Sequence, residues 1–395
     1  MPKKKPEVKN LYYITHIDNL ASIFSKGILS HRLIEELQIP YTRIYDEAIV
    51  SNRGAKVVPD GRSLWDFANL YFQPRNAMLF RVLHERGEKQ IVVLGVNPEV
   101  LSTVGVFVAA GNAASAETKV FPREQGMREI FKMWDIISGE YWNSMDGSKR
   151  KMMAECLVPE RVSSDHIHSI YVATHEVSQA IRQMGLPGRV SAVPEPSIFF
   201  RPVRQYRITP HLSLADGDMF FSFMQTLTVS VNTVGVMGKG LASRAKYQFP
   251  DVYVTYQDAC RRKLVALGKP FLYKREAFVD ADLADEPTSL KNVNANKWFL
   301  LFATKKHWRD MSDLNAIRDG LRWVGDNYQR EGIKSLALPA LGCGLGRLDW
   351  RDVGPVICQE LGSLDMNVAV YLPREHMIPE QLLTRDFLLA QAGHK

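Results

Sequence analysis

Residues 231–243 read VNTVGVMGKGLAS, and this stretch decides the fold of the second half of the chain. A β-branched run at residues 225–231 precedes it, and an apolar segment with helical spacing, residues 241–249, follows it. Glycines let the backbone approach a phosphate closely, and the free N–H groups at a helix start bind an anion. A strand–helix turn that needs positive φ for its own sake has the same composition. The spacing matches neither G-x-x-x-x-G-K-[ST] nor G-x-G-x-x-G, which disfavours a nucleotide hydrolase and a nicotinamide dehydrogenase.

A second glycine-rich stretch lies farther along the chain in the same setting. Residues 338–350 read LPALGCGLGRLDW, between a predicted strand and a predicted helix. Two backbone cradles, each at the carboxyl end of a strand, are what a diphosphate needs to be held from both sides. Upstream, Asp218 in the stretch DGDM offers a carboxylate to an adenine amino group, although a solvated turn has the same composition. The two loops together indicate a ligand that carries a diphosphate.

Strands and helices alternate around these loops. A helix with apolar residues on one face is expected over residues 314–324, capped at Ser312 or Asp313. The other expected elements are strands at 297–303, 335–340 and 367–372 and helices at 349–361 and 378–390. Such alternation predicts a central sheet with helices on both faces.

The first half is less regular and is predicted to be α+β. A helix at residues 18–26 ends at Gly27, and much of residues 31–90 is expected to be loop that carries polar and aromatic residues. Strands are expected at 91–96 and 168–172, and a helix at 176–184. A Pro- and Gly-rich passage at residues 185–212 separates the halves. We therefore predict two domains, residues 1–203 and 204–395.

Composition narrows the class of protein. The chain has 395 residues, 46% hydrophobic and 24% charged, with a net charge of +7 that suits a phosphate-rich ligand and also many ordinary proteins. No apolar run approaches the ~18 residues of a membrane span, and no apolar segment follows the basic start as in a signal peptide. The four cysteines lack CxxC spacing. We expect a reduced, cytoplasmic protein with no metal and no membrane contact.

Candidate chemistry in the first half rests on single residues. Glu155, in the stretch KRKMMAECLVP, is either a catalytic carboxylate or an ordinary helix surface residue. Arg53 is either a phosphate clamp or a loop cation. Tyr71, with Phe72, Arg75 and Met78, is either a platform that stacks a flat ring or a core patch. The basic triplet Lys149, Arg150 and Lys151 either holds DNA phosphates or is a solvated face.

Residues 208–395 resemble a macrodomain of the DarG antitoxin type, related to macrodomains that remove ADP-ribose from modified targets. The resemblance rests on GD at 217–218, NTVGVMGKGLA at 232–242, ATKKHWR at 303–309 and LPALGCGLG at 338–346. It implies an α/β/α fold with a mixed central sheet, Asp218 at the adenine, and the glycine loops at the diphosphate and distal ribose. The ADP-ribose-binding residues that it implies are Asp218, Asn232, Gly235, Met237, Gly238, Gly240, Thr304, Gly342, Cys343, Gly344 and Leu345.

The same resemblance implies that Lys305 is the catalytic residue of this half. The lysine follows a strand that is predicted to be buried, and desolvation lowers a lysine pKa, which frees an amine to attack the anomeric carbon. Lys306 and Lys239 are competing candidates. In some relatives an Asp from the second loop assists the lysine, and the corresponding position here is Gly346. Lys305 is therefore expected to act without that partner.

Residues 10–200 resemble the DarT family of DNA ADP-ribosyltransferase toxins. The matching stretches are YITHIDNLASIFSKG at 13–27, residues 49–53, LYFQPRNAMLF at 70–80, GNAAS at 111–115 and MAECLVP at 153–159. The resemblance implies an ADP-ribosyltransferase-like fold with NAD as the substrate.

The DarT resemblance also implies roles for individual residues. The implied NAD-binding residues are Tyr13, Thr15, Arg53, Tyr71 and Met78, with Tyr71 at the nicotinamide side. Arg53 and Glu155 are the implied catalytic pair, and the loop at residues 112–155 presents the DNA base. Arg75, Lys149, Arg150 and Lys151 are the candidate DNA-binding residues. The family pattern has His where this chain has Tyr13, which cannot be protonated in the same way and bears on NAD affinity or rate.

We predict a fused toxin and antitoxin in one chain. The first domain transfers ADP-ribose from NAD to a base of single-stranded DNA, with thymine as the family's acceptor. The macrodomain hydrolyses the ADP-ribose off again, and the two domains pair within one molecule. Two alternatives stay open: a degenerate transferase that leaves a DNA ADP-ribose hydrolase, and a module that binds ADP-ribose without catalysis.

Overall fold

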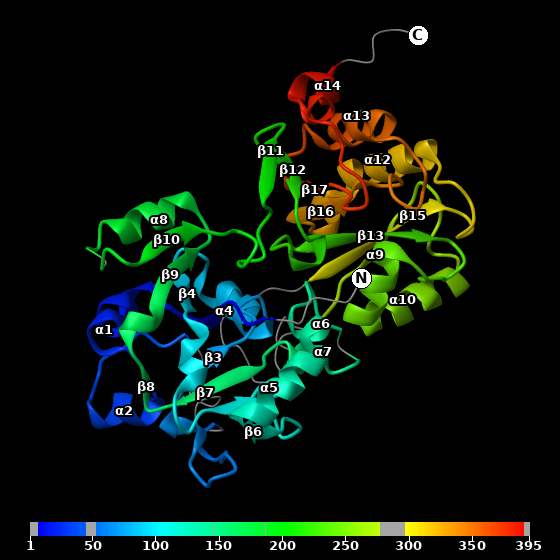
Figure 1. Ribbon diagram of the computed structural model, residues 1–395. Coiled ribbons are helices and arrows are strands. Elements are labelled where there is room, and N and C mark those ends of the chain that lie inside the picture. Colours follow the sequence, from blue (N-terminus) through cyan, green and yellow to red (C-terminus); the bar gives the residue numbers. More distant parts are fainter. Residues whose placement is uncertain (1–6, 45–52, 144, 186, 277–296, 391–395) are drawn as a thin grey trace, which may run out of the picture. The chain divides into compact units, whose positions relative to one another are not determined.

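The computed structural model describes residues 7–44, 53–143, 145–185, 187–276 and 297–390, which divide into two compact units (Figure 1). The first unit ends at Phe199 and the second begins at Phe200, four residues before the boundary that the sequence suggests. None of the helices in these ranges is long and apolar enough to span a membrane.

In the described part of the first unit, eight strands form one sheet in the order β10–β9–β4–β1–β3–β7–β5–β6. Their bounds are β1 Leu11–His16, β3 Phe67–Tyr71, β4 Ile91–Val96, β5 Phe107–Ala109, β6 Val120–Pro122, β7 Glu155–Pro159, β9 Ile167–Val172 and β10 Ser191–Pro194. Neighbours are antiparallel except β9 and β10, which run parallel. Every residue of β4 is buried, which explains its unbroken apolar sequence IVVLGV.

Short helices complete this unit. They are α1 Leu20–Lys26, α2 His31–Glu36, α4 Ala77–Arg86, α5 Arg123–Lys132, α6 Trp134–Ile137, α7 Ser148–Lys151 and α8 His175–Arg182. A small ladder pairs β2 Ile28–Leu29 with β8 Arg161–Val162. The expected helix at 18–26 is a 3-10 turn, Ile17–Asn19, followed by α1, which ends at Gly27 with φ 90°. The predicted strands at 91–96 and 168–172 and the helix at 176–184 are confirmed as β4, β9 and α8.

Much of the described part of residues 31–90 is loop, as expected, but the stretch also holds regular elements. The described residues of this stretch contain α2, β3 and α4. The side chain of Ser30 caps α2 by accepting a hydrogen bond from Leu33 N, and the Asn76 side chain caps α4 in the same way from Leu79 N. The strand β3 has four of its five residues buried, so it lacks the alternation of apolar and polar residues that marks a half-buried strand.

The described part of the second unit is a three-layer α/β/α structure. Its sheet has seven strands in the order β11–β12–β17–β16–β13–β15–β14. Their bounds are β11 Arg204–Arg207, β12 Leu212–Asp216, β13 Thr226–Asn232, β14 Phe271–Tyr273, β15 Trp298–Lys305, β16 Ser335–Pro339 and β17 Asn367–Tyr371. The five inner strands run parallel, and the edge strands β11 and β14 are antiparallel to their neighbours. The predicted mixed central sheet is confirmed.

Helices cover both faces of this sheet (Figure 1). One face packs against α12 Leu314–Glu331, α13 Trp350–Leu361 and α14 Arg385–Leu389, and the other against α9 Gly240–Gln248 and α10 Pro250–Arg261. Alternate residues of β15 serve the two cores, with Phe302 on the α12 side and Leu301 on the α10 side. The expected single helix at 378–390 is wrong, since Thr384 separates a 3-10 turn, Glu380–Leu383, from α14 and caps the latter through Phe387 N.

The pairing of β13 with β15 ends in a bulge. Val231 pairs with Ala303, and the next pair is Asn232 with Lys305, so Thr304 is the extra residue. The Thr304 side chain is buried, with its hydroxyl 3.1 Å from those of Ser230 and Ser312. A bulge re-aims the side chains beside it, and this one lies immediately before Lys305.

Candidate active sites

The candidate transferase centre is built on the first residue of β7. Glu155 pairs across the sheet with Tyr71 of β3 on one side and with Ala109 of β5 on the other, and its side chain is fully buried. Both terminal nitrogens of Arg53 donate hydrogen bonds to the carboxylate: Nη1 lies 3.3 Å from Oε1 and Nη2 lies 2.8 Å from Oε2. Ala113 N donates a further hydrogen bond of 2.9 Å to Oε1. The surface-residue interpretation of Glu155 is therefore wrong.

This arrangement fixes a negative charge inside a protein interior. A buried carboxylate is tolerated when it is paired and hydrogen-bonded, and here a guanidinium and a backbone N–H satisfy both conditions. A fixed anion stabilises positive charge that develops on a nearby ribose as a glycosidic bond breaks. The GNAAS stretch at residues 111–115 carries no sequence signal that Ala113 N–H would bond to the Glu155 carboxylate. Residues 49–52 of the predicted motif lie outside the described residues.

The candidate NAD-binding residues of the first unit lie on neighbouring elements. Tyr13 and Thr15 are on β1, opposite Leu94 and Val92 of β4, and Tyr71 ends β3 next to β1. Tyr13 is half-buried against the main apolar core, and Thr15 is buried. Met78 is half-buried and is the second residue of α4. Arg75 lies just before this helix, and its Nη1 is 3.5 Å from Ser197 O.

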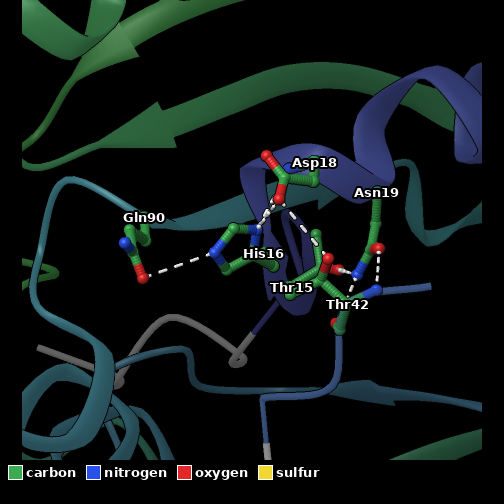
Figure 2. A network of polar contacts seen from close by, with 6 residues as sticks. All are labelled: Thr15, His16, Asp18, Asn19, Thr42 and Gln90. Carbon is green, nitrogen blue, oxygen red and sulfur yellow. Dashed lines mark hydrogen bonds and ion pairs between the residues drawn. The ribbon is translucent and has the colours of Figure 1, made fainter.

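A network of polar contacts joins Thr42 to the end of β1 (Figure 2). The side-chain amide of Asn19 donates to Thr42 O at 2.9 Å and to Thr15 Oγ1 at 3.1 Å, and its oxygen accepts from Thr42 N at 2.7 Å. His16, also in Figure 2, is buried between Gln90 Oε1 and the Asp18 backbone and carboxylate. Asn19 thus holds Thr15 and the chain at Thr42 in one arrangement.

Asn19→Ala is expected to weaken NAD binding by the transferase about tenfold. The substitution removes two hydrogen bonds to the Thr42 backbone, each worth about 1 kcal/mol, and releases Thr15. Thr42→Val is the matched control, because it keeps the backbone partners of Asn19 and loses one long contact from its hydroxyl to Asp18 at 3.4 Å. Calorimetry with NAD measures the effect, and equal affinities of the two variants would contradict it.

The basic triplet of α7 does not form one solvated face. Lys149 is only 9% exposed, so the predicted role of its ammonium at the DNA surface does not fit its place in the structure. Arg150 pairs with Glu117 at 3.3 Å and approaches Thr118 Oγ1 at 3.4 Å, and its carbonyl accepts from Asn112 N. Lys151 Nζ lies 3.5 Å from Asp146 O. DNA binding by Arg150, Lys151 and Arg75 stays a prediction.

The second candidate site lies where three neighbouring parallel strands end. The first glycine loop follows β13, the second follows β16, and Lys305 is the last residue of β15. The loops come together: a Cβ placed on Gly240 of the first would lie 3.3 Å from the Leu345 side chain of the second. Carboxyl ends of parallel strands are the usual place for a ligand in an open α/β sheet.

Asn232 shapes the first glycine loop from within. Its side-chain oxygen accepts hydrogen bonds from Val234 N and Val236 N, and its amide donates to Val236 O at 2.7 Å. The buried Tyr256 hydroxyl contacts both the backbone oxygen and the side-chain oxygen of Asn232. Asn232 therefore holds the loop in shape through its side-chain oxygen and one amide N–H, and the N–H groups of Thr233, Val234 and Val236 are engaged within the protein.

The other predicted ligand-binding residues surround these loops. Met237, Thr304, Gly342 and Cys343 are buried, while Gly238, Gly240, Gly344 and Leu345 are exposed. Gly235 and Gly342 have φ of 79° and 78°, a conformation that favours glycine. The described residues contain no cluster of three His, Cys, Asp or Glu side chains that could hold a metal ion.

Lys305 is held between the second loop and its own turn. Its Nζ donates to Asp310 O at 2.9 Å and to Leu345 O at 3.3 Å. Partial burial and the positive charge of Arg347 lower the pKa of Lys305, and the negative charge of Asp310 opposes them. The competing candidates Lys239 and Lys306 are both exposed. The geometry therefore favours Lys305 as the nucleophile.

Gly346 occupies a position where no side chain fits. A Cβ there would lie 2.3 Å from Ser312 Oγ and 2.5 Å from Gly342 O. Its own carbonyl accepts from Ser312 N at 3.0 Å. The structure thus explains why this position carries glycine: the backbone of the second loop is packed against residue 312.

Gly346→Ala is expected to lower the glycohydrolase rate at least about tenfold. The new methyl group would force the second loop away from Ser312, and with it the Leu345 carbonyl that holds Lys305; a misplacement of 1 Å at an active site costs rates of this size. Gly325→Ala in α12 is the matched control, because a Cβ on Gly325 makes only ordinary contacts, with Leu364 Cδ2 at 3.8 Å and Glu360 O at 3.9 Å. Release of ADP-ribose from modified DNA measures both, and equal rates would contradict the prediction.

Asp218 has a partner that the sequence did not indicate. Its Oδ1 accepts from Phe220 N at 3.1 Å, and its Oδ2 lies 2.7 Å from Arg244 Nη2. The pair is almost fully enclosed, with side-chain exposures of 13% for Arg244 and 2% for Asp218. The guanidinium also lies 5.0 Å from the Phe220 ring. An adenine amino group would therefore share this carboxylate with Arg244.

Comparisons with known proteins assign both halves. A family model described as "ssDNA thymidine ADP-ribosyltransferase, DarT" matches residues 12–200. The DNA ADP-ribosyl transferase–DNA ADP-ribosyl glycohydrolase fusion protein of Thermosipho africanus is 51% identical over 385 residues, which is 97% of this chain and 99% of that protein. The DNA ADP-ribosyl glycohydrolase of Thermus aquaticus is 36% identical over 166 residues, 42% of each chain.

A solved structure agrees with these matches. Thermosipho africanus DarTG in complex with ADP-ribose superposes with a TM-score of 0.88 at 50% sequence identity, covering 96% of this chain and 100% of that one. One relative therefore accounts for both units and for their order along the chain. The chain belongs to the family of fused DNA ADP-ribosyl transferase–DNA ADP-ribosyl glycohydrolase proteins.

Proposed function

We propose that this chain transfers ADP-ribose from NAD to thymine in single-stranded DNA and removes it again by means of Lys305. The family is that of a fused toxin and antitoxin, with the DarT-like transferase first and the glycohydrolase second. The observation that carries the proposal is the pair of centres: a buried, bidentate Arg53–Glu155 ion pair, and a lysine of lowered pKa held between the second glycine loop and its own turn.

In the transferase, the bond between nicotinamide and ribose C1″ breaks, and neutral nicotinamide leaves with the bonding electrons. Glu155, fixed by Arg53 and Ala113 N–H, stabilises the positive charge that develops on the ribose. The thymine ring nitrogen loses its proton as it bonds to C1″. Single-stranded DNA avoids the cost of extracting a base from a duplex.

In the glycohydrolase, the free amine of Lys305 attacks C1″, and thymine leaves and takes up a proton. Water then cleaves the lysine–ribose bond, so the net reaction is hydrolysis. The two glycine loops hold the diphosphate, and Asp218 takes the adenine amino group beside Arg244. Because both units belong to one chain, the eraser is present at high effective concentration near each new product.

We also place the protein in the cytoplasm, where NAD and single-stranded DNA are available. All four cysteines, Cys156, Cys260, Cys343 and Cys358, are free thiols. Free thiols suit a reducing compartment.

Intact mass spectrometry of a thymine-containing single-stranded oligonucleotide tests both activities. The oligonucleotide is incubated with NAD and the full-length Lys305→Ala chain, and a gain of one ADP-ribose is expected. Adding the Glu155→Ala chain, which keeps the eraser, should restore the original mass. A thymine-free oligonucleotide is the control for the base. An unmodified thymine oligonucleotide would overturn the transferase assignment.

Tyr13 favours a second candidate function, in which the transferase half has lost turnover. Tyrosine at this position retains an aromatic face and a hydrogen-bonding tip and lacks the imidazole of the family pattern. The chain would then act only as a DNA ADP-ribose hydrolase. NAD binding by calorimetry without release of nicotinamide would favour this candidate over the first.

A further inference from the structure

The turn that follows the catalytic lysine is unusually well fixed. Lys305 Nζ donates to Asp310 O at 2.9 Å, and His307 N donates to Asp310 Oδ2 at 2.8 Å. Asp310 N returns a bond to His307 O at 3.1 Å. Thr233, in the first glycine loop, donates from both its N–H and its hydroxyl to Lys306 O at 3.0 Å. The side chains between Lys305 and Asp310 therefore have a set place beside the reacting centre.

Trp308 stands on this turn with its ring in solvent. Its exposed fraction is 49%, which is high for so large an apolar side chain. Exposed apolar side chains on a protein surface often mark a binding site. The ring centroid of Trp308 lies 5.2 Å from that of His307, and the Arg309 guanidinium lies 4.6 Å from it. A ring placed in this way buries little apolar surface in the core of the unit and so contributes little to its stability. A ligand with a flat face would bury it.

The charge around Trp308 is positive. Lys306, two residues before Trp308, and Arg309, directly after it, are both exposed. Arg347 of the second loop is also exposed, and its positive charge lowers the pKa of Lys305. The nearest acid along the turn, Asp310, has one carboxylate oxygen engaged by His307 N. An exposed ring between cations is the combination that binds single-stranded nucleic acid, because bases stack on the ring and phosphates pair with the cations.

We propose that Trp308, with Lys306 and Arg309, forms a dock for the DNA strand on the glycohydrolase unit, in which the indole stacks on a base next to the modified thymine. The inference rests on the proposed function, since it places DNA at the carbon that Lys305 attacks. The ADP-ribose moiety itself is held by the glycine loops and Asp218. The dock therefore supplies preference for ADP-ribose on a DNA strand over ADP-ribose on a single nucleoside.

The test compares two substrates in the full-length chain with the Glu155→Ala change, which prevents re-modification. We expect Trp308→Ala to lower kcat/KM about 10- to 100-fold on an ADP-ribosylated single-stranded oligonucleotide, as loss of one stacked base does. The effect should lie mainly in KM, with little change on ADP-ribosylated thymidine. Trp308→Phe, which keeps a flat ring, should restore most of the loss. Arg309→Ala should reduce the salt dependence of KM.

Tyr247→Ala is the matched control, because Tyr247 is 44% exposed and also lies beside a cation, with Lys246 Nζ 5.4 Å from its ring, but on α9. It should leave both substrates unaffected. An equal loss on both substrates after Trp308→Ala would assign Trp308 to the shape of the turn and overturn the dock. Unchanged rates on both would overturn it as well.

A photo-crosslinking arm separates the dock from the proposed activity. A single-stranded oligonucleotide that carries 5-iodouracil is irradiated with the same chain, and the crosslinked residue is mapped by mass spectrometry. A crosslink at Trp308 supports the dock even if the chain releases no ADP-ribose, a result that would overturn the glycohydrolase assignment alone. Crosslinks that avoid residues 306–309 would overturn the dock alone.

Discussion

Lys305→Ala should abolish the removal of ADP-ribose from DNA, with a loss of at least about 1,000-fold in rate, the scale seen when a covalent nucleophile is removed. The lysine is the last residue of β15 and is oriented by two carbonyl oxygens, Asp310 O and Leu345 O. The variant should keep its affinity for ADP-ribose, because we propose that the glycine loops and Asp218, and not Lys305, bind that moiety. With the transferase intact, the variant should be toxic to cells.

Lys239→Ala is the control for this result. Lys239 is an exposed lysine in the first glycine loop and is, with Lys306, one of the two competing candidates; its loss should change the rate by less than about tenfold. The rates are read from ADP-ribose released by a pre-modified oligonucleotide. A Lys305→Ala chain that still erases the mark, or a Lys239→Ala chain that does not, would refute the assignment.

The pH profile gives an independent check on Lys305. Attack requires the free amine, so the rate should fall as the pH drops through the lysine pKa. Arg347 lowers that pKa and Asp310 raises it. Arg347→Gln should therefore move the acidic limb of the profile to higher pH, and Asp310→Asn should move it to lower pH while retaining an acceptor for His307 N. Shifts in the same direction for both variants would contradict this electrostatic account.

Glu155→Gln should eliminate transfer of ADP-ribose to DNA, again by about 1,000-fold or more. Glutamine keeps the size of the side chain but removes the negative charge that would stabilise the ribose cation. It also removes the negative charge from the buried ion pair with Arg53. Since the Arg53 side chain is 18% exposed and reaches some water, we expect a loss of about 1–3 kcal/mol in the free energy of unfolding, below the value for a fully buried pair.

Release of nicotinamide and modification of the oligonucleotide measure the loss separately. Glu176→Gln is the matched control: its carboxylate is 71% exposed and pairs with Lys89 at the surface, so activity and stability should both be kept. Combining Glu155→Gln with Lys305→Ala should remove the toxicity of the latter. Persistent toxicity of the double variant would show that the modification does not depend on Glu155.

The second unit could be predicted in most detail, because its signals are local. Residues 225–231 became β13 within one residue, and Asp313 caps α12 as its sequence position indicated. The helix expected at 349–361 is α13, which begins one residue later with Asp349 as its cap. The strands β13, β15 and β16 each lead into a helix, so this part of the chain repeats a strand, turn and helix pattern that is visible in a short window. The helix α10 was missed, although Pro250 at its first turn is a start signal.

The first unit could be predicted less well, because its contacts are distant in sequence. Arg53 and Glu155 are 102 positions apart, and the partners of β1 lie in β3 and β4. The family resemblance located both residues of the ion pair, but their bidentate geometry and the Ala113 N–H come from tertiary structure. The burial of Lys149 and the Asp218–Arg244 pair have no local signal either, since both depend on side chains brought in from other elements.

The bulge at Thr304 gives Lys305 a different strand register from the residues of β15 that pack in the core. Six pairs between β13 and β15 run in one register, and the pair that carries Lys305 is offset from them by one residue. Because side chains alternate along a strand, deleting Thr304 alone would turn the lysine toward the α12 face and leave the six pairs intact. A single-codon deletion is therefore expected to impair the removal of ADP-ribose while the six pairs of the sheet stay in register.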